Sequence, residues 1–148
     1  MNCISSTAAS SEIDEEMQGG YSFMMKNKTV EACNKWENTW NLITSTMDSN
    51  GYESIEDFDE DFKGQQNIYN WASDYECELG NALLDDTSFA QKRIDFCSEY
   101  LKRYSNKNDF NIGGMKSRLG DGAGLGGLTS LGCLRFLKIG IMKKPLDC

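Results

Sequence analysis

A spacing of small and large residues that occurs twice constrains the fold of this chain more than any other feature of its sequence. The two copies are Ala32-x3-Trp36-x2-Thr39 and Ala90-x3-Ile94-x2-Cys97. Residues three and four apart lie on one face of an α-helix, so each copy places a large apolar side chain between small ones. Small neighbours let a second helix approach closely. The spacing therefore predicts two tightly paired sets of antiparallel helices.

Apolar residues recur every three to four positions along the first two thirds of the chain, which is the period of an amphipathic helix. The expected helices cover residues 13–25, 29–50, 54–62, 68–83 and 90–104. Thr29 and Ser54 are the expected N-caps of the second and third helices, and Asn50-Gly51 ends the second. No alternation of period two is sustained. The predicted fold class is all-α, with two antiparallel helical hairpins joined by a short inserted helix.

Large apolar side chains on these helical stripes form the expected core. The residues that we place at its centre are Trp36, Trp40, Trp71, Leu79, Ile94 and Leu101. Tryptophans on such stripes are more often core anchors than platforms for a cofactor. With 148 residues, of which 39% are hydrophobic, the chain is long enough to bury this core as one domain.

Composition divides the chain into three parts. They are a frayed N-terminus (1–11), a helical-repeat domain (12–105) and a glycine-rich basic tail (106–148). Nine of the 14 glycines lie between residues 113 and 140, and each glycine costs a helix interior about 1 kcal/mol relative to alanine. We expect a poorly structured or weakly helical tail that is the least stable part of the chain. Arg135 and Lys138 interrupt its apolar residues, which argues against a membrane span.

Charge is distributed as unevenly as glycine. Residues 1–100 contain 20 acidic and 6 basic residues, whereas residues 101–148 contain 3 acidic and 9 basic ones, so net charges of −14 and +6 add to −8. The acidic part is expected to repel nucleic acid. The basic tail either neutralises the acidic part, with lysines such as Lys138 facing Asp59 or Glu60, or contacts an anionic partner.

The N-terminus and the cysteines both favour a cytoplasmic protein. Residues 1–16 contain no basic start and no apolar run before their acidic cluster, so we expect no secretory signal. The six cysteines show no C-x-x-C spacing, and Cys33, Cys77 and Cys97 fall on apolar helix faces. A thiol in that setting behaves as a small hydrophobic group. We therefore predict reduced thiols.

Residues 46–57 suggest an alternative function, because they resemble the loop of an EF-hand calcium site. Asp48 and Asn50 stand at the expected offsets. Thr46 replaces the usual first aspartate, and Asp57 replaces the usual final glutamate. A calcium-responsive protein that uses Asp48, Asn50 and Asp57 is the alternative to a plain connection between two helices.

The Gly19-Gly20 pair suggests a second alternative. It resembles the end of the leader that precedes exported peptides, and the glycine-rich tail resembles a segment of such a peptide. Asp14 stands where these leaders carry an apolar residue, and cleavage after Gly20 would remove the helix that covers Trp36 and Trp40. The alternative is an exported glycine-rich peptide precursor.

The sequence offers few residues for catalysis. It contains no histidine, the commonest general base and metal ligand. We expect the acidic residues within 57–61 to form a solvated face, and Asp74 and Glu78 to be exposed as well. Glycines of the tail match neither the dinucleotide-binding nor the P-loop pattern. We therefore predict a protein that is not an enzyme and that has no cofactor and no metal site.

Several segments carry a resemblance to a known family. They are Gly20-x2-Phe23 and residues 29–40, 55–59 and 69–82. Together they resemble a divergent group of bacterial, clostridial-type tetratricopeptide-like repeat proteins, over residues 13–104. Members of that group often carry a C-terminal SEC-C metal-binding motif. Cys133 and Cys148 stand alone in this chain, so the motif is absent and zinc binding is not expected.

The resemblance implies an interaction scaffold in which a concave helical face holds a protein or peptide partner. Polar positions on the inner helices are the candidate contacts. The residues that we predict to bind the partner are Asn70, Asp74 and Asn81. The sequence leaves the oligomeric state open.

Overall fold

The computed structural model describes residues 3–106, 112–113 and 115–116, without the side chains of residues 3–6. The described part is helical and contains no strand, which confirms the predicted all-α class. Its helices are α1 (Cys3–Met25), α2 (Thr29–Asn50), α3 (Ile55–Asp61), α4 (Ile68–Ala82) and α5 (Phe89–Arg103). None of these helices combines the length and the apolar character needed to cross a membrane.

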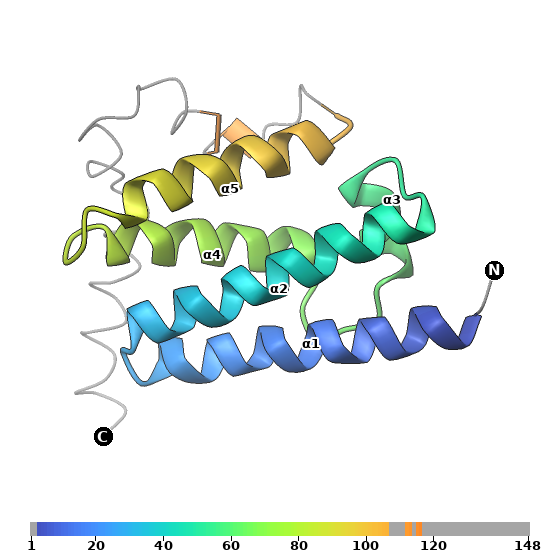
Figure 1. The fold of residues 1–148 in the computed structure, drawn as a ribbon, viewed down its shortest axis with the longest axis horizontal. Coiled ribbons are helices and arrows are strands. Elements are labelled where there is room, and N and C mark those ends of the chain that lie inside the picture. Colours follow the sequence, from blue (N-terminus) through green and yellow to red (C-terminus); the bar gives the residue numbers. More distant parts are fainter. Residues whose placement is uncertain (1–2, 107–111, 114, 117–148) are drawn as a thin grey trace.

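The four long helices form two stacked antiparallel hairpins, as the sequence predicts (Figure 1). The helix α1 pairs with α2, and α4 pairs with α5. The helices α2 and α4 pack together in the middle of the array, and this contact joins the hairpins. The short helix α3 lies at the end of the array where the chain passes from α2 to α4.

The first hairpin shows the close approach that the small-residue spacing predicts. Ala32, Trp36 and Thr39 are all fully buried. Gly20 of α1 lies directly against the Trp36 ring, since a Cβ at position 20 would be 2.1 Å from Nε1. The Trp36 indole N–H donates a hydrogen bond of 2.9 Å to the carbonyl oxygen of Met17. The Gly19-Gly20 pair thus lies inside α1, at its contact with α2.

The second copy of the spacing does not describe the buried face of α5. Cys97 is buried, but Ala90 and Ile94 are only half-buried. Leu101 is half-buried as well, so the prediction that Ile94 and Leu101 lie at the centre of the core is wrong. The face that α5 buries consists of Phe89, Arg93, Phe96, Cys97 and Tyr100. The helix turns this face inward because it places large rings against the aromatic side chains of α2 and α4.

Aromatic rings form the continuous centre of the core. Trp40 stacks on Trp71 with 6.3 Å between the ring centroids, and Phe96 meets Trp40 edge-on at 5.1 Å. Tyr75 lies 4.5 Å from Phe96 and 6.0 Å from Trp36, which links the two hairpins. Trp36, Trp40, Trp71 and Leu79 are buried, as predicted. Offset and edge-on pairs of this kind add to the stability that burial of their area provides.

Several helix ends follow the predicted signals. Gly51 closes α2 in the left-handed conformation, with φ at +72°. The Ser54 side chain accepts a hydrogen bond from the N–H of Asp57 and so caps α3. Thr29, in contrast, is already the first residue of α2, and Lys28 precedes the helix without a side-chain cap. The prediction that Thr29 is the N-cap is therefore wrong.

Both ends of the helical region extend beyond the predicted limits. The helix α1 begins at Cys3 rather than at Ile13, because adding residues to an existing helix costs much less than nucleating one. Ile112 and Met115, which the sequence assigns to the tail, are buried against the core. The predictions for the rest of residues 107–148 lie outside the described residues.

Candidate functional site

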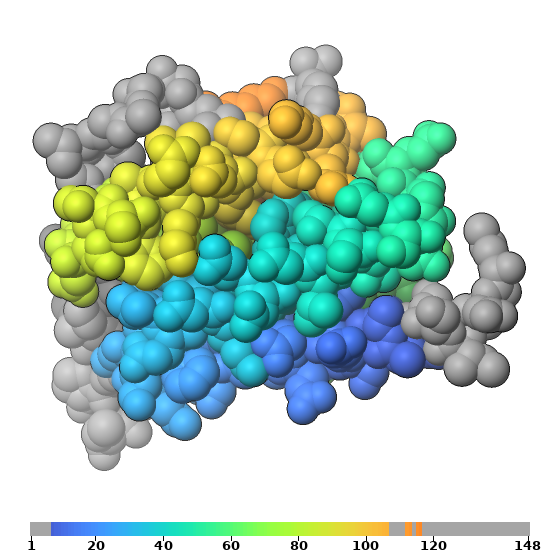
Figure 2. Space-filling model, viewed as in Figure 1, coloured from blue at the N-terminus to red at the C-terminus, as the bar shows by residue number. Residues whose placement is uncertain are grey.

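A groove opens between α2 and α5 on the face shown in Figure 2. Its volume is about 300 Å³. The residues that line it, here called the α2–α5 groove, are Glu37, Trp40 and Asn41 of α2, Tyr75 of α4, and Lys92, Asp95, Phe96 and Glu99 of α5. Side chains from three helices therefore meet in this groove.

The α2–α5 groove combines an aromatic floor with a charged rim. Trp40, Tyr75 and Phe96 form the floor and belong to the aromatic core. On the rim, Lys92 donates a hydrogen bond of 2.9 Å to the carboxylate of Glu37. Ligand sites are typically concave and apolar with a few well-placed polar groups. The groove shares the concave shape and the polar groups, but its lining is about as polar as it is apolar.

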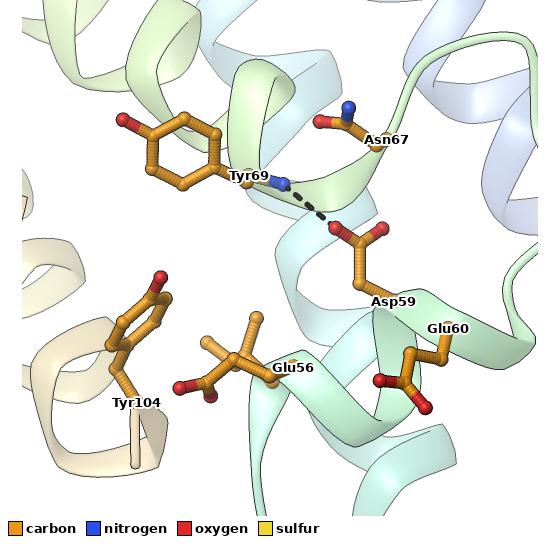
Figure 3. Close-up of a pocket in the computed structure, with 7 residues that line it drawn as sticks. Glu56, Asp59, Glu60, Asn67, Tyr69 and Tyr104 are labelled. Atoms are coloured by element: carbon orange, nitrogen blue, oxygen red, sulfur yellow. Dashed lines mark hydrogen bonds between the residues drawn. The ribbon is translucent and has the colours of Figure 1, made fainter. Parts of the chain in front are cut away.

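A second concave site, here called the tyrosine-acid pocket, lies where α3, α4 and the end of α5 meet (Figure 3). Its volume is about 290 Å³. Around it lie Glu56, Asp59, Glu60, Asn67, Tyr69 and Tyr104. The carboxylates of Glu56 and Asp59 project from α3 towards Tyr104 and Tyr69.

Two acids of the tyrosine-acid pocket also hold the surrounding helices in place. Asp59 accepts hydrogen bonds from the backbone N–H groups of Ile68 (2.7 Å) and Tyr69 (3.4 Å) at the start of α4. The expectation that the acidic run is wholly solvated is therefore wrong for Asp59, which serves as a helix cap. Burial opposes the charge of Glu56, yet hydrogen bonds from Ser105 and Asn106 keep the pKa of Glu56 below its ordinary value.

The three residues predicted to bind a partner lie along α4, and none of them lines the α2–α5 groove. Asn70 is exposed. Asp74 accepts a hydrogen bond of 2.7 Å from the Tyr21 hydroxyl of α1. Asn81 is buried and donates its amide to Glu78 at 2.9 Å. The Asn70 amide also has a partner, since it donates to Gln66 at 3.1 Å. The binding role of all three residues stays a prediction.

Asp74 and Glu78 are not the exposed pair that the sequence predicts. Asp74 is half-buried and Glu78 is buried. Burial raises the pKa of both carboxyl groups. The hydrogen bonds from Tyr21 to Asp74 and from Asn81 to Glu78 partly oppose this rise. Both acids lie where the packing of α1 and α2 against α4 encloses them.

The residues of the EF-hand-like segment do not come together. Asp48 lies in the last part of α2 and forms a 2.8 Å ion pair with Arg103. The Asn50 amide donates to the carbonyl oxygen of Thr46, and Asp57 lies in the first turn of α3. Within residues 3–106, 112–113 and 115–116, no three Asp, Glu or Cys side chains are grouped to hold a metal ion.

The cysteines of the described helices differ in state. Cys33 and Cys97 are buried and form no disulfide, which agrees with the predicted reduced thiols. Cys77 is disulfide-bonded, and its partner is not among the described side chains. The prediction of a reduced thiol is therefore wrong for Cys77. Cys77 is half-buried and does not belong to the buried stripe of α4.

The sequence analysis missed the aromatic floor of the α2–α5 groove. Trp40 and Tyr75 lie on predicted stripes, but Phe96 does not lie on the face predicted for α5. A signal for the correct face exists, because Phe96, Tyr100 and Tyr104 follow one another at intervals of four residues. Aromatic side chains at that spacing share one helix face.

Comparisons with known proteins found no relative of this chain. No protein-family model matches the chain, and no curated protein or solved structure matches it. The resemblance to tetratricopeptide-like proteins stays a prediction. The function proposed below is therefore argued from the geometry of the described residues.

Proposed function

We propose that this chain is a non-catalytic binding module in which two stacked helical hairpins hold a segment of a protein or peptide in the α2–α5 groove. One observation carries the proposal, namely that three helices together present the rings of Trp40, Tyr75 and Phe96 at the bottom of an open groove. Trp40 is 8% exposed, and Tyr75 and Phe96 are 3% exposed, so the rings offer a bound side chain narrow aromatic edges at the bottom of the groove. This function agrees with the predicted helical-repeat scaffold.

The rim of the α2–α5 groove indicates which segments suit it. Glu37, Asp95 and Glu99 contribute three negative charges to the rim. Glu37 pairs with Lys92 and Glu99 pairs with Arg103, so Asp95 is the rim acid for which the described residues show no ion pair. A segment with one large apolar side chain and a basic flanking residue therefore fits both floor and rim. Binding of this kind uses a small number of anchors in an apolar groove.

Selection from a library of displayed peptides tests the proposal on the full chain. We expect selected peptides to share an apolar anchor next to a basic residue, and to lose binding to the variant Asn41→Trp. Asn41 lines the α2–α5 groove, and the larger ring at this position fills it. The matched control is Asn38→Trp, because Asn38 is exposed on the same helix and does not line the groove.

Equal binding of the selected peptides to both tryptophan variants would contradict the proposal. A peptide set without any common anchor would do so as well, since an aromatic floor that takes no particular side chain is not a recognition site. Circular dichroism of both variants checks that the helices are retained.

The compartment in which this module works also stays a prediction. The sequence favours the cytoplasm, whereas disulfides such as that of Cys77 are rare in reducing compartments. Alkylation of free thiols in intact cells, followed by mass spectrometry of the Cys77 peptide, distinguishes the cytoplasm from an oxidising compartment. Modified Cys77 supports the cytoplasm, and Cys77 that reacts only after reduction supports an oxidising compartment.

A further inference from the structure

The side of α4 that does not belong to its buried stripe carries small side chains around Cys77. Ser73, Cys77 and Gly80 are spaced four and three residues apart, so they share one side of the helix. Leu84, four residues beyond Gly80, is exposed. These four residues are here called the Cys77 face. Tyr75, which lines the α2–α5 groove, is two positions from Cys77 and therefore lies on the opposite side of α4.

Two helices border the Cys77 face. On one side, the Tyr21 hydroxyl of α1 donates to Asp74. On the other side, Arg93 of α5 donates to Glu76. Small side chains between these two helices allow a further segment of chain to approach α4 closely.

Elimination narrows the choice of disulfide partner for Cys77. Cys33 and Cys97 form no disulfide. The cysteines that remain are Cys3, which begins α1, and Cys133 and Cys148 of the tail.

Cys3 lies too far from Cys77 to be the partner. The helices α1 and α4 run in the same direction (Figure 1), and Tyr21 is hydrogen-bonded to Asp74. About 27 Å of helix separates Cys3 from Tyr21, whereas Cys77 lies just beyond Asp74 in the opposite direction. The Cα atoms of a disulfide are at most about 7 Å apart. The partner of Cys77 is therefore a cysteine of the tail.

Exposed apolar side chains lie at the end of the array next to the Cys77 face. In the part of the chain that the structure describes, the exposed large ones are Met25, Val30 and Leu84, here called the end patch. They belong to the α1–α2 and α4–α5 connections, which lie at the same end of the array (Figure 1). Thr29 forms a hydrogen bond with Glu78, the neighbour of Cys77 in sequence. This contact places the start of α2 beside the Cys77 face.

The apolar residues of the tail surround one of its two cysteines. Cys133 lies within residues 128–142, whose large apolar members are Leu128, Leu131, Leu134, Phe136, Leu137, Ile139, Ile141 and Met142. Cys148, in contrast, follows the polar stretch Lys143-Lys144-Pro145. The chain between residue 116 and Cys133 can span about 56 Å, so its length allows Cys133 to reach α4. A disulfide to Cys133 brings apolar cover to the end patch.

Charge favours the same segment. Residues 128–142 contain Arg135 and Lys138 and no acidic residue. Asp85 and Asp86 are exposed and follow directly after Leu84. Basic side chains of a segment that covers Leu84 therefore meet these acids, although exposed pairs of this kind add little to stability.

We propose that residues 128–142 dock on the Cys77 face and the end patch, and that a disulfide between Cys77 and Cys133 holds them there. When the bond forms, the two thiols lose two protons and two electrons to a disulfide oxidant such as oxidised glutathione, which becomes two thiols. The docked segment leaves the α2–α5 groove open, because the groove lies on the other side of α4. This inference is therefore independent of the proposed binding function.

Peptide mapping of the full chain identifies the partner of Cys77. The chain is equilibrated in a glutathione redox buffer, and its free thiols are then blocked with N-ethylmaleimide. Trypsin places each cysteine in a separate peptide. We expect the Cys77 peptide, 64–92, to be linked to the Cys133 peptide, 119–135. A link to any other cysteine peptide, or a blocked thiol at Cys77, would overturn the inference.

A variant of the end patch tests whether the segment docks or is only tethered. The measured quantity is the equilibrium constant for forming the Cys77–Cys133 disulfide against glutathione, which reports how closely the folded chain holds the two thiols together. Leu84→Asn should lower it about tenfold, because the docked segment no longer buries a leucine there. The matched control is Leu101→Asn, since Leu101 is half-buried on α5 outside both surfaces.

The control variant should leave the equilibrium constant unchanged, and circular dichroism checks that both variants keep their helices. An unchanged constant for Leu84→Asn would show a covalent tether without docking. An equal loss in both variants would show general destabilisation. Either result would contradict docking on the end patch.

Discussion

At the scale of single residues, contacts between α1 and α2 explain why small side chains are required. A Cβ at position 20 would lie 2.1 Å from Nε1 of Trp36, within a fully buried contact. A Cβ at position 19 would meet the flexible side chain of Lys35, whose Cε is the nearest atom at 2.7 Å. Adjacent glycines in one helix therefore face very different surroundings.

We predict that Gly20→Ala lowers the free energy of unfolding by about 1–3 kcal/mol, because the Trp36 ring has to move in a closely packed core. Gly19→Ala is the matched control. It should be neutral or stabilising by up to about 1 kcal/mol, since alanine favours the helix and Lys35 can move aside. Urea denaturation of both variants measures the change in the free energy of unfolding. Equal changes for Gly20→Ala and Gly19→Ala would contradict the close packing at Gly20.

Asp74 gives a prediction about pH at the same scale. Burial raises its pKa in the folded protein above the value of about 3.9 in the unfolded chain. The folded state therefore binds the proton more tightly, and stability is lost as pH rises from the unfolded to the folded pKa. Asp74→Asn removes this loss while its amide oxygen can still accept from Tyr21.

The stability of Asp74→Asn relative to the parent should therefore increase as pH rises above about 4. Urea denaturation at several pH values measures the difference. Asp48 provides the contrast, since hydrogen bonding from Arg103 lowers its pKa and its contribution to stability is lost as pH falls. A difference for Asp74→Asn that is independent of pH would show that Asp74 titrates normally.

At the scale of helices, α4 and α5 are joined by a buried ion pair. Nε of Arg93 donates to Oε1 of Glu76 at 2.8 Å, and Nη2 donates to the same oxygen. Both side chains are at most 7% exposed. Gly80 leaves room for the guanidinium group, because a Cβ there would lie 3.0 Å from its Cζ.

We predict that Arg93→Met or Glu76→Met alone lowers stability by about 3–5 kcal/mol, because each leaves one buried charge without its partner. The double variant should be more stable than the sum of the two single effects predicts, since it leaves no charge in the interface. Denaturant unfolding of all four proteins gives the coupling energy. Additive effects would show that the two residues stabilise the protein independently.

Periodicity in the sequence predicted the helices well but one helix face badly. The apolar stripes of α2 and α4 contain the three tryptophans. Side chains of this size have to be buried, so they determine which face of each helix points to the core. On α5, Ile94 and Leu101 compete with Phe96 and Tyr100 for the interior, and periodicity alone does not decide between two apolar stripes one residue apart. The rings of Phe96 and Tyr100 are buried because the aromatic side chains of α2 and α4 lie opposite them.

At the scale of the whole molecule, both candidate sites arise from contacts that sequence patterns do not encode. The floor of the α2–α5 groove needs Trp40, Tyr75 and Phe96 from three helices. The tyrosine-acid pocket needs the end of α5 to reach α3, which the hydrogen bonds between Glu56 and Ser105 secure across 49 residues. Asn70, Asp74 and Asn81 are predicted from the polar positions along the sequence of α4, and such positions carry no information on contacts between helices.

The indole resonances of the three tryptophans test the central claim, binding in the α2–α5 groove, most directly. Trp40 lines the groove, whereas Trp36 is fully buried and bonded to Met17 of α1. Titration of the labelled full chain with a selected peptide should shift the indole N–H resonance of Trp40 and leave that of Trp36 in place. A peptide that binds without moving the Trp40 resonance, or that moves Trp36 as much, would contradict binding in the α2–α5 groove.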